Sequence, residues 1–247
     1  MTTLLSDFRS ALAFITVLPA GKNVAWSPLG MIRFFPVVGL ILGGIVYLFD
    51  LLVSPLWPPL VVALLDTVLL VCLTGGFHLD GLGDAADGLF SHRPRERALE
   101  IMKDSRIGMM ALVAVVSVLA VKTAGIYSVK VSAPSVLVFL AVPSLARGGM
   151  LFGIRFLNYG RKNSGTGLDL FEKSLGLRDF AFLLIPVAIS LFLGYNGLVL
   201  IGTFAAASAG ILIFYKIKMD CITGDMLGAM TELLEAVLFL AAGILVV

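Results

Sequence analysis

Long apolar stretches recur along the whole chain and constrain its fold more than any other feature. A helix that spans a bilayer needs about 20 mainly apolar residues, because the hydrocarbon layer is about 30 Å thick and a helix rises about 1.5 Å per residue. The sequence predicts about seven such spans, at residues 34–53, 58–73, 107–127, 134–152, 180–195, 197–215 and 228–247. We therefore predict an all-α, polytopic integral membrane bundle that forms one membrane-embedded domain over residues 1–247.

The N-terminal segment has a different pattern from the spans. Residues 1–20 carry Asp7 and Arg9 within an apolar pattern in which Leu5, Phe8 and Leu12 recur at helical spacing. Such a pattern predicts an amphipathic helix that lies on the membrane surface.

The few charges exclude several classes of protein. Apolar residues make up 59% of the chain and charged residues 14%, with a formal net charge of +2. Soluble domains average about 25% charged residues, and nucleic-acid binders need a strong excess of basic charge. The sequence therefore indicates a membrane protein with no nucleic-acid partner, and its contacts are with membrane lipid. A homo-oligomer is compatible with the sequence.

The distribution of basic residues predicts the orientation of the chain. Most of the eighteen Lys and Arg residues fall in the N-terminal segment or in the loops after the second, fourth and sixth predicted spans. Because short basic loops stay on the cytoplasmic side, the N-terminus is predicted to be cytoplasmic and the C-terminus to be outside. Most acidic residues lie on the same side as the basic loops. Any chemistry is therefore expected at the cytoplasmic face of the cytoplasmic (inner) membrane.

The densest polar motif follows the second predicted span and reads GGFHLDGLGDAADG over residues 75–88. If this segment is helical, Asp80, Asp84 and Asp87 stand at i, i+4 and i+7 and share one face. A solvated acidic face would normally include Lys or Arg, whereas Gly, Leu and Ala lie between these aspartates. A divalent cation such as Mg²⁺ or Mn²⁺ would relieve the repulsion. His78 is a candidate ligand or base, and hydrogen bonding to a ligand is an equally good interpretation.

Further polar residues cluster where the chain enters or leaves the predicted spans. Asp104 lies in the motif KDSRIG of residues 103–108, and Asp225 and Glu232 lie seven residues apart beside Glu235. A helix cap at Thr223 would explain Asp225 but not Glu232. The candidate phosphate-binding residues are Lys103, Arg106, Arg147, Arg161 and Lys162.

An unpaired charge inside a span is costly, and three of the charged residues inside the predicted spans are informative. Arg147 lies near the cytoplasmic end of the fourth span, so we expect it to have a functional partner. Asp66 and Lys122 are the other two, and we expect them to pair with each other.

The motifs over residues 75–108 and 222–235 resemble those of the cobalamin 5'-phosphate synthase family, also called adenosylcobinamide-GDP ribazoletransferases. The resemblance extends over essentially the whole chain and includes FPVVG at residues 35–39 and ITGD at residues 222–225. One departure is Thr231, where the family pattern has Asn before the Glu.

The resemblance implies an integral membrane, Mg²⁺-dependent catalytic domain of cobalamin biosynthesis. It implies that a ribose hydroxyl of α-ribazole or its 5'-phosphate attacks the β-phosphorus of adenosylcobinamide-GDP and releases GMP. Metal ions and basic residues neutralise charge in such phosphoryl transfers. We expect one of the three aspartates or His78 to be the base, and the full set of expected metal ligands is Asp80, Asp84, Asp87, Asp104, Asp225 and Glu232.

Two other functions are compatible with parts of the sequence. A CDP-alcohol phosphotransferase has a signature that opens D-x-x-D-G, as residues 84–88 do, but Ser91 and His92 stand where Ala and Arg are expected. A membrane transporter would place its polar site near the bilayer midplane, often between two similar halves. Here the acidic residues gather on one side of the membrane, and the halves share no obvious repeat.

Overall fold

The computed structural model describes residues 3–132, 135–161 and 167–244, and these residues are helical except for turns, loops and one isolated β-bridge. The predicted all-α fold is therefore confirmed. The helices are α1 Leu4–Ile15, α2 Pro28–Ile32, α3 Phe35–Val53, α4 Pro59–Leu73, α5 Phe77–Leu89, α6 Arg95–Ile101, α7 Met109–Ser132, α8 Val136–Phe156, α9 Leu184–Leu191, α10 Tyr195–Met219 and α11 Gly224–Ile244, with short 3₁₀ segments η1 Leu168–Phe171 and η2 Leu177–Leu183.

Five helices in the described part of the chain are long and apolar enough to cross a membrane, namely α3, α7, α8, α10 and α11. A sixth span is obtained if α4 and α5 are counted together, although they are bent by 89°. The predicted span at residues 180–195 forms η2 and α9, which have 7 and 8 residues and are each too short to cross alone. The polytopic bundle is thus confirmed with five to six long apolar helices, fewer than the seven expected.

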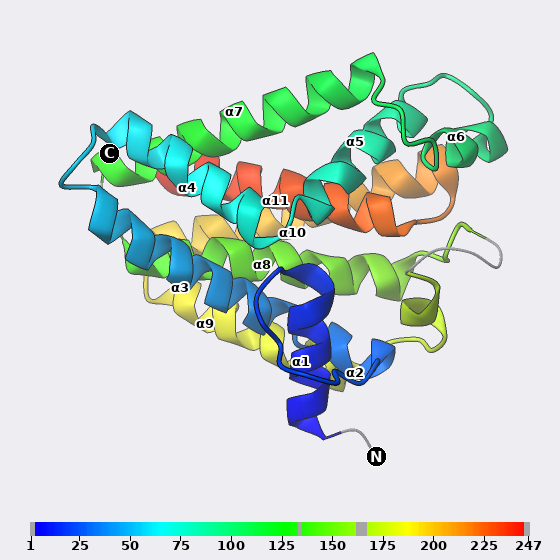
Figure 1. Ribbon diagram of the computed structural model, residues 1–247, viewed down its shortest axis with the longest axis horizontal. Coiled ribbons are helices and arrows are strands. Elements are labelled where there is room, and N and C mark those ends of the chain that lie inside the picture. The colour runs from blue at the N-terminus through cyan, green and yellow to red at the C-terminus, as the bar shows by residue number, and fades with distance from the viewer. Residues whose placement is uncertain (1–2, 133–134, 162–166, 245–247) are drawn as a thin grey trace.

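The centre of the bundle is formed by α8 and α11. Both are mostly buried, whereas α7 and α10 expose most of their apolar surface. In Figure 1 the long helices run side by side along the long axis, and α1 crosses that axis below α8. Exposed apolar faces on the outer helices suit a protein whose solvent is lipid, because lipid tails are as apolar as the side chains.

The N-terminal segment forms the helix that its pattern predicts. Thr3 caps α1 by accepting a hydrogen bond from the Ser6 amide, and one face of α1 buries Ala11 and Ile15. Leu4 and Leu5, in the first turn of α1, are exposed. The helix therefore packs on the bundle and also presents apolar side chains outward.

The sharp bend between α4 and α5 occurs at two glycines. Gly75 and Gly76 have φ values of +60° and +72°, a backbone conformation that costs other residues about 1–2 kcal/mol. Their amides donate to the carbonyls of Cys72 and Val71 and close the end of α4. The chain then enters α5 in a new direction, toward the start of α7.

Four charged residues are enclosed in the bundle and form what we call the buried charge cluster: Lys122, Arg147, Glu232 and Glu235. Lys122 Nζ donates to Glu232 Oε2 and Glu235 Oε2, both at 2.6 Å, and Arg147 Nη1 donates to Glu235 Oε1 at 2.6 Å. The cluster joins α7, α8 and α11, and its two positive and two negative charges balance. The expected pair of Asp66 with Lys122 is wrong, because the Lys122 ammonium group donates its hydrogen bonds to the two glutamates of α11.

Substitution of Lys122 by Met should destabilise the protein strongly. The change leaves Glu232 without its only hydrogen-bonded cation in the described residues, and breaking a buried pair typically costs about 3–5 kcal/mol. The free energy of unfolding in detergent micelles measures this loss. Lys216→Met is the matched control because Lys216 forms an exposed pair with Asp220, and it should change little. Equal effects of the two substitutions would show that the cluster does not stabilise the fold.

Candidate active site

The three aspartates of the acidic motif lie on α5, which confirms the helix that their spacing predicts. His78, Gly81 and Ala85 form the buried side of this helix, whereas Asp80 is exposed and Asp84 is half-buried. The aspartates thus occupy the outward face, which we call the carboxylate row (Asp80, Asp84 and Asp87). The row lies beyond the α4–α5 bend, on the half of the molecule that carries the charged loops.

Close packing of α5 on α11 brings a fourth carboxylate to the row. A side chain at Gly81 would come within 2.9 Å of the Asp225 carbonyl oxygen, and one at Gly228 within 3.2 Å of the His78 backbone. Only glycine permits this approach without a shift of one helix. As a result, Asp84 lies within electrostatic range of Asp80, Asp87 and Asp225, and also of Arg161.

Arg161 reaches the row through a short backbone pairing of two loops. The Gly160 amide donates to the Ile222 carbonyl at 2.8 Å, and the Ile222 amide donates to the Asn158 carbonyl at 2.9 Å. This pairing sets Arg161 beside the start of α11, where its Nη2 donates to Asp225 Oδ2 and to the Met102 carbonyl. Thr223 Oγ1 accepts from the Met226 amide at 3.2 Å, so the helix cap is present as well.

Asp87 binds the start of α7. Its two carboxylate oxygens accept from the amides of Gly108 and Ala111, at 2.6 and 2.9 Å. The first amides of a helix have no partner within the helix and carry partial positive charge, so a carboxylate there is stabilised. This contact ties the acidic motif to the KDSRIG segment.

Asp104 and Arg106 of that segment bind each other. Arg106 Nε donates to both Asp104 oxygens, at 2.9 and 3.0 Å. These bonds and the guanidinium charge lower the pKa of Asp104 to about 2. The Arg106 side chain is 88% exposed. Asp104 is therefore paired with the Arg106 guanidinium group.

Three of the predicted site residues are directed into the core and away from the row. Arg147 and Glu232 belong to the buried charge cluster, and the His78 ring lies within electrostatic range of that cluster. Neither His78 ring nitrogen has a hydrogen-bond partner in the described residues. Lys162 lies outside the described residues. The roles predicted for Arg147, Glu232 and His78 gain no support from their placement.

Two cavities are lined by residues of the site. The first, which we call the α5–α7 cavity, has a volume of about 600 Å³ and is lined by residues that include Asp80 and Asp84. The second, the α6 cavity, has a volume of about 370 Å³ and includes Lys103 and Arg161 in its lining. Both volumes fall in the range of ligand sites, about 300–1,000 Å³.

Arg95 is a residue that sequence reasoning missed. It lines the α6 cavity, although a position in a short helix of mixed charge is typical of a solvated side chain. Its neighbour Arg97 binds Glu100 and does not line the cavity. The two arginines leave α6 in different directions. Only the packing of the 157–161 loop beside α6 decides which of these directions faces a cavity, and the sequence does not show that packing.

The carboxylates are compatible with a magnesium ion that the substrate helps to hold. Within residues 3–132, 135–161 and 167–244, no three Asp, Glu, His or Cys side chains converge closely enough to enclose a metal ion. Mg²⁺ in phosphoryl-transfer sites is usually held by one or two carboxylates together with substrate phosphates and water. Asp80 and Asp84, which line one cavity, supply such a pair.

A family match covers almost the whole chain. The profile of the cobalamin-5-phosphate synthase family matches residues 7–243. The chain belongs to this family. That match covers the carboxylate row, Arg161 and Asp225, so the site described above lies within the shared part of the sequence.

Curated members of the cobalamin-5-phosphate synthase family match nearly the whole chain. The adenosylcobinamide-GDP ribazoletransferase of Acetivibrio thermocellus is 38% identical over 203 residues, which are 81% of each chain. The proteins of the same name from Clostridium botulinum strain Loch Maree and Desulforamulus reducens are 33% and 32% identical over 95% of this chain, and over 96% and 95% of their own. No solved structure matches the chain significantly.

Substitution of Gly81 by Ala should lower turnover by up to about 100-fold, because a displacement of about 1 Å of α5 from α11 misplaces the reacting groups. The added methyl group would meet the backbone of Asp225 at 2.9–3.0 Å, and backbone cannot move aside alone. Gly202→Ala on α10 is the control, since nothing lies within 4 Å of its added methyl group. Steady-state assays of both variants, normalised to folded protein, measure the effect. Unchanged turnover in Gly81→Ala would contradict the role of this contact.

Proposed function

We propose that this chain transfers the adenosylcobinamide phosphoryl group from adenosylcobinamide-GDP to α-ribazole or its 5'-phosphate and releases GMP, with Mg²⁺ at Asp80 and Asp84. The observation that carries the proposal is that Asp84 interacts electrostatically with Asp80, Asp225 and Arg161, while Asp80 and Asp84 line one cavity and Arg161 lines another. The family match and the names of the relatives support the same activity.

A magnesium ion at this place would neutralise charge on the diphosphate and on the leaving phosphate. Asp80 and Asp84 would hold it, because their carboxylates line a cavity and have no cationic hydrogen-bond partner in the part of the chain that the structure describes. Asp225 forms an ion pair with Arg161, and Asp87 accepts a hydrogen bond from the Gly108 amide at the start of α7.

The side chains of this protein then bind and orient the two substrates. The ribose hydroxyl oxygen forms a bond to the β-phosphorus, the phosphoanhydride bond to the GMP oxygen breaks, and GMP leaves with that electron pair. A carboxylate of the row accepts the hydroxyl proton. Arg161 neutralises diphosphate charge while it keeps Asp225 in place.

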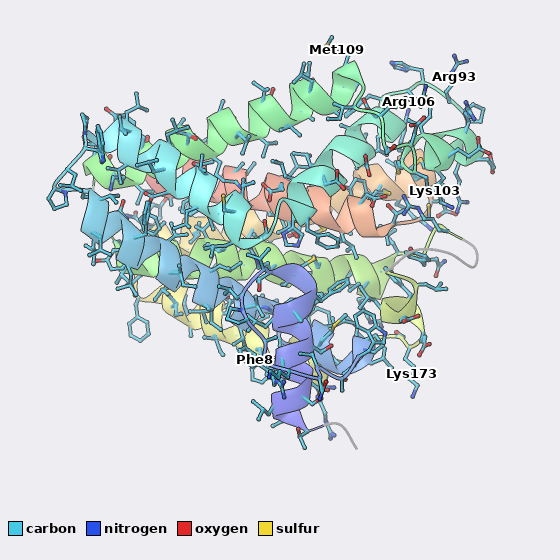
Figure 2. The ribbon with its side chains drawn as sticks, viewed as in Figure 1. Phe8, Arg93, Lys103, Arg106, Met109 and Lys173 are labelled. Atoms are coloured by element: carbon cyan, nitrogen blue, oxygen red, sulfur yellow. The ribbon has the colours of Figure 1, made fainter. Side chains whose placement is uncertain are left out.

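The site is proposed to face the cytoplasm from the inner membrane. Figure 2 places Arg93, Lys103, Arg106 and Lys173 toward the same end of the molecule, and the C-terminus lies at the other end in Figure 1. Basic residues at one end favour that end as the cytoplasmic one. Nucleotide substrates are made in the cytoplasm, so this orientation gives them direct access.

The family match favours this transferase over the two other functions considered. A CDP-alcohol phosphotransferase would share the carboxylate chemistry but release CMP. A transporter would release no nucleotide from its substrate. Analysis of the nucleotide product therefore distinguishes all three.

Asp84→Asn should abolish GMP release, with turnover reduced at least about 1,000-fold, because the site loses one of two carboxylates that would hold the metal ion. Purified protein, adenosylcobinamide-GDP, α-ribazole and Mg²⁺ provide the assay. Asp220→Asn is the matched control, since Asp220 pairs with Lys216 at the surface and should leave turnover unchanged. Full activity of Asp84→Asn would remove the metal-binding role of the row.

Excess EDTA should stop GMP release, and added Mg²⁺ should restore it. The expected saturation curve for Mg²⁺ shifts to lower concentration as adenosylcobinamide-GDP is raised, because the diphosphate supplies part of the coordination. Undiminished turnover in EDTA would contradict metal dependence.

A further inference from the structure

We propose that the two substrates approach the carboxylate row from opposite sides, with the aromatic nucleoside in the α5–α7 cavity and the nucleoside diphosphate in the α6 cavity. This assignment rests on the proposed function and adds to it the place of each substrate. It follows from the chemistry of the two linings.

The α5–α7 cavity suits an apolar aromatic base. Its lining consists of Gly and apolar side chains together with two carboxylates: Gly75, Gly76, Phe77, Leu79, Asp80, Gly83, Asp84, Ile107, Ala111, Leu112 and Val115. At its mouth Ile107 is 83% exposed and Leu112 51%. An apolar lining stabilises the dimethylbenzimidazole of α-ribazole by removing it from water, and the two carboxylates accept hydrogen bonds from ribose hydroxyls.

The α6 cavity suits an anion. Three cationic side chains line it, Arg95, Lys103 and Arg161, with two acidic ones, Glu96 and Glu100. Arg97, which is not part of the lining, binds Glu100 at 2.6 Å and neutralises it. Arg161 is also paired with Asp225, but a guanidinium group has five N–H donors, so Arg95 and Arg161 can both donate charge-assisted hydrogen bonds to phosphate groups.

The carboxylate row and Arg161 connect the two cavities. Asp84 lines the α5–α7 cavity, whereas Arg161 lines the α6 cavity, and each acts electrostatically on the other. Phosphoryl transfer requires the attacking and leaving oxygens to lie roughly in line on opposite sides of the phosphorus. An acceptor on one side of the row and the GMP group on the other side meet this requirement.

The acceptor side is tested by filling the α5–α7 cavity. Val115→Phe should raise the KM for α-ribazole about tenfold or more and leave the KM for adenosylcobinamide-GDP unchanged, because the larger ring takes the space of the base. Val116→Phe is the matched control, since the next residue of α7 is 56% exposed and does not line the cavity. A raised KM for the donor alone would overturn the assignment.

The donor side is tested with GDP as a competitive inhibitor against adenosylcobinamide-GDP. Arg95→Gln should raise the inhibition constant of GDP about tenfold or more, since a charge-assisted hydrogen bond is lost. Arg93→Gln is the control, since Arg93 is exposed just before α6 and does not line the cavity, and it should leave the inhibition constant unchanged. Equal inhibition constants in Arg95→Gln and the unchanged protein would overturn the assignment.

Lipid phosphate could occupy the same cations, so the inhibition constant of GDP is also compared in nanodiscs of phosphatidylcholine with and without phosphatidylglycerol. Equal constants are expected for a nucleotide site. A tenfold rise with phosphatidylglycerol would assign the α6 cavity to lipid headgroups instead.

Failure of this assignment is distinguishable from failure of the proposed function. If the unchanged protein releases no GMP from the two substrates, the proposed function is wrong. If it releases GMP while Val115→Phe acts on the donor and Arg95→Gln on the acceptor, only the assignment of the cavities is wrong.

Discussion

The contact between α5 and α11 is the interaction on which the site depends. Without side chains at Gly81 and Gly228, the two helix backbones approach closely enough for Asp225 to join Asp80 and Asp84. Carboxylates at such spacing repel one another, so this packing carries an electrostatic cost that the rest of the fold must offset. Arg161 and the amides at the start of α7 offset part of that cost. The site therefore combines tight apolar packing with charges that are only partly neutralised.

The buried charge cluster keeps α11 in position for this contact. Glu232 and Glu235 lie two to three turns beyond Asp225 on the same helix, and they bind Lys122 of α7 and Arg147 of α8. In an apolar surrounding a charge without a partner is costly, so a rotation or shift of α11 would be resisted by the loss of these pairs. One helix thus carries both the structural charges and a charge of the site.

Local features of this site could be predicted from the sequence, whereas the partners of each charge could not. The i, i+4, i+7 spacing placed three aspartates on one face of α5, and Thr223 was recognisable as a helix cap. Lys122 and Glu232, however, are 110 residues apart, and their pairing depends on which helices are neighbours. The same reasoning missed Arg95 and grouped Glu232 with the site, because acidic and basic residues look alike in sequence whether they bind substrate or one another.

In the proposed mechanism the protein offers a divalent cation two carboxylates, and the diphosphate of the substrate completes the coordination. Mn²⁺ binding to the full-length protein, followed by electron paramagnetic resonance with and without GDP, tests this claim directly. We predict weak binding of Mn²⁺ alone, binding at least about tenfold tighter with GDP, and loss of that enhancement in a variant with Asn at positions 80 and 84. Binding that is equally tight without GDP, or that persists in the variant, would contradict the account.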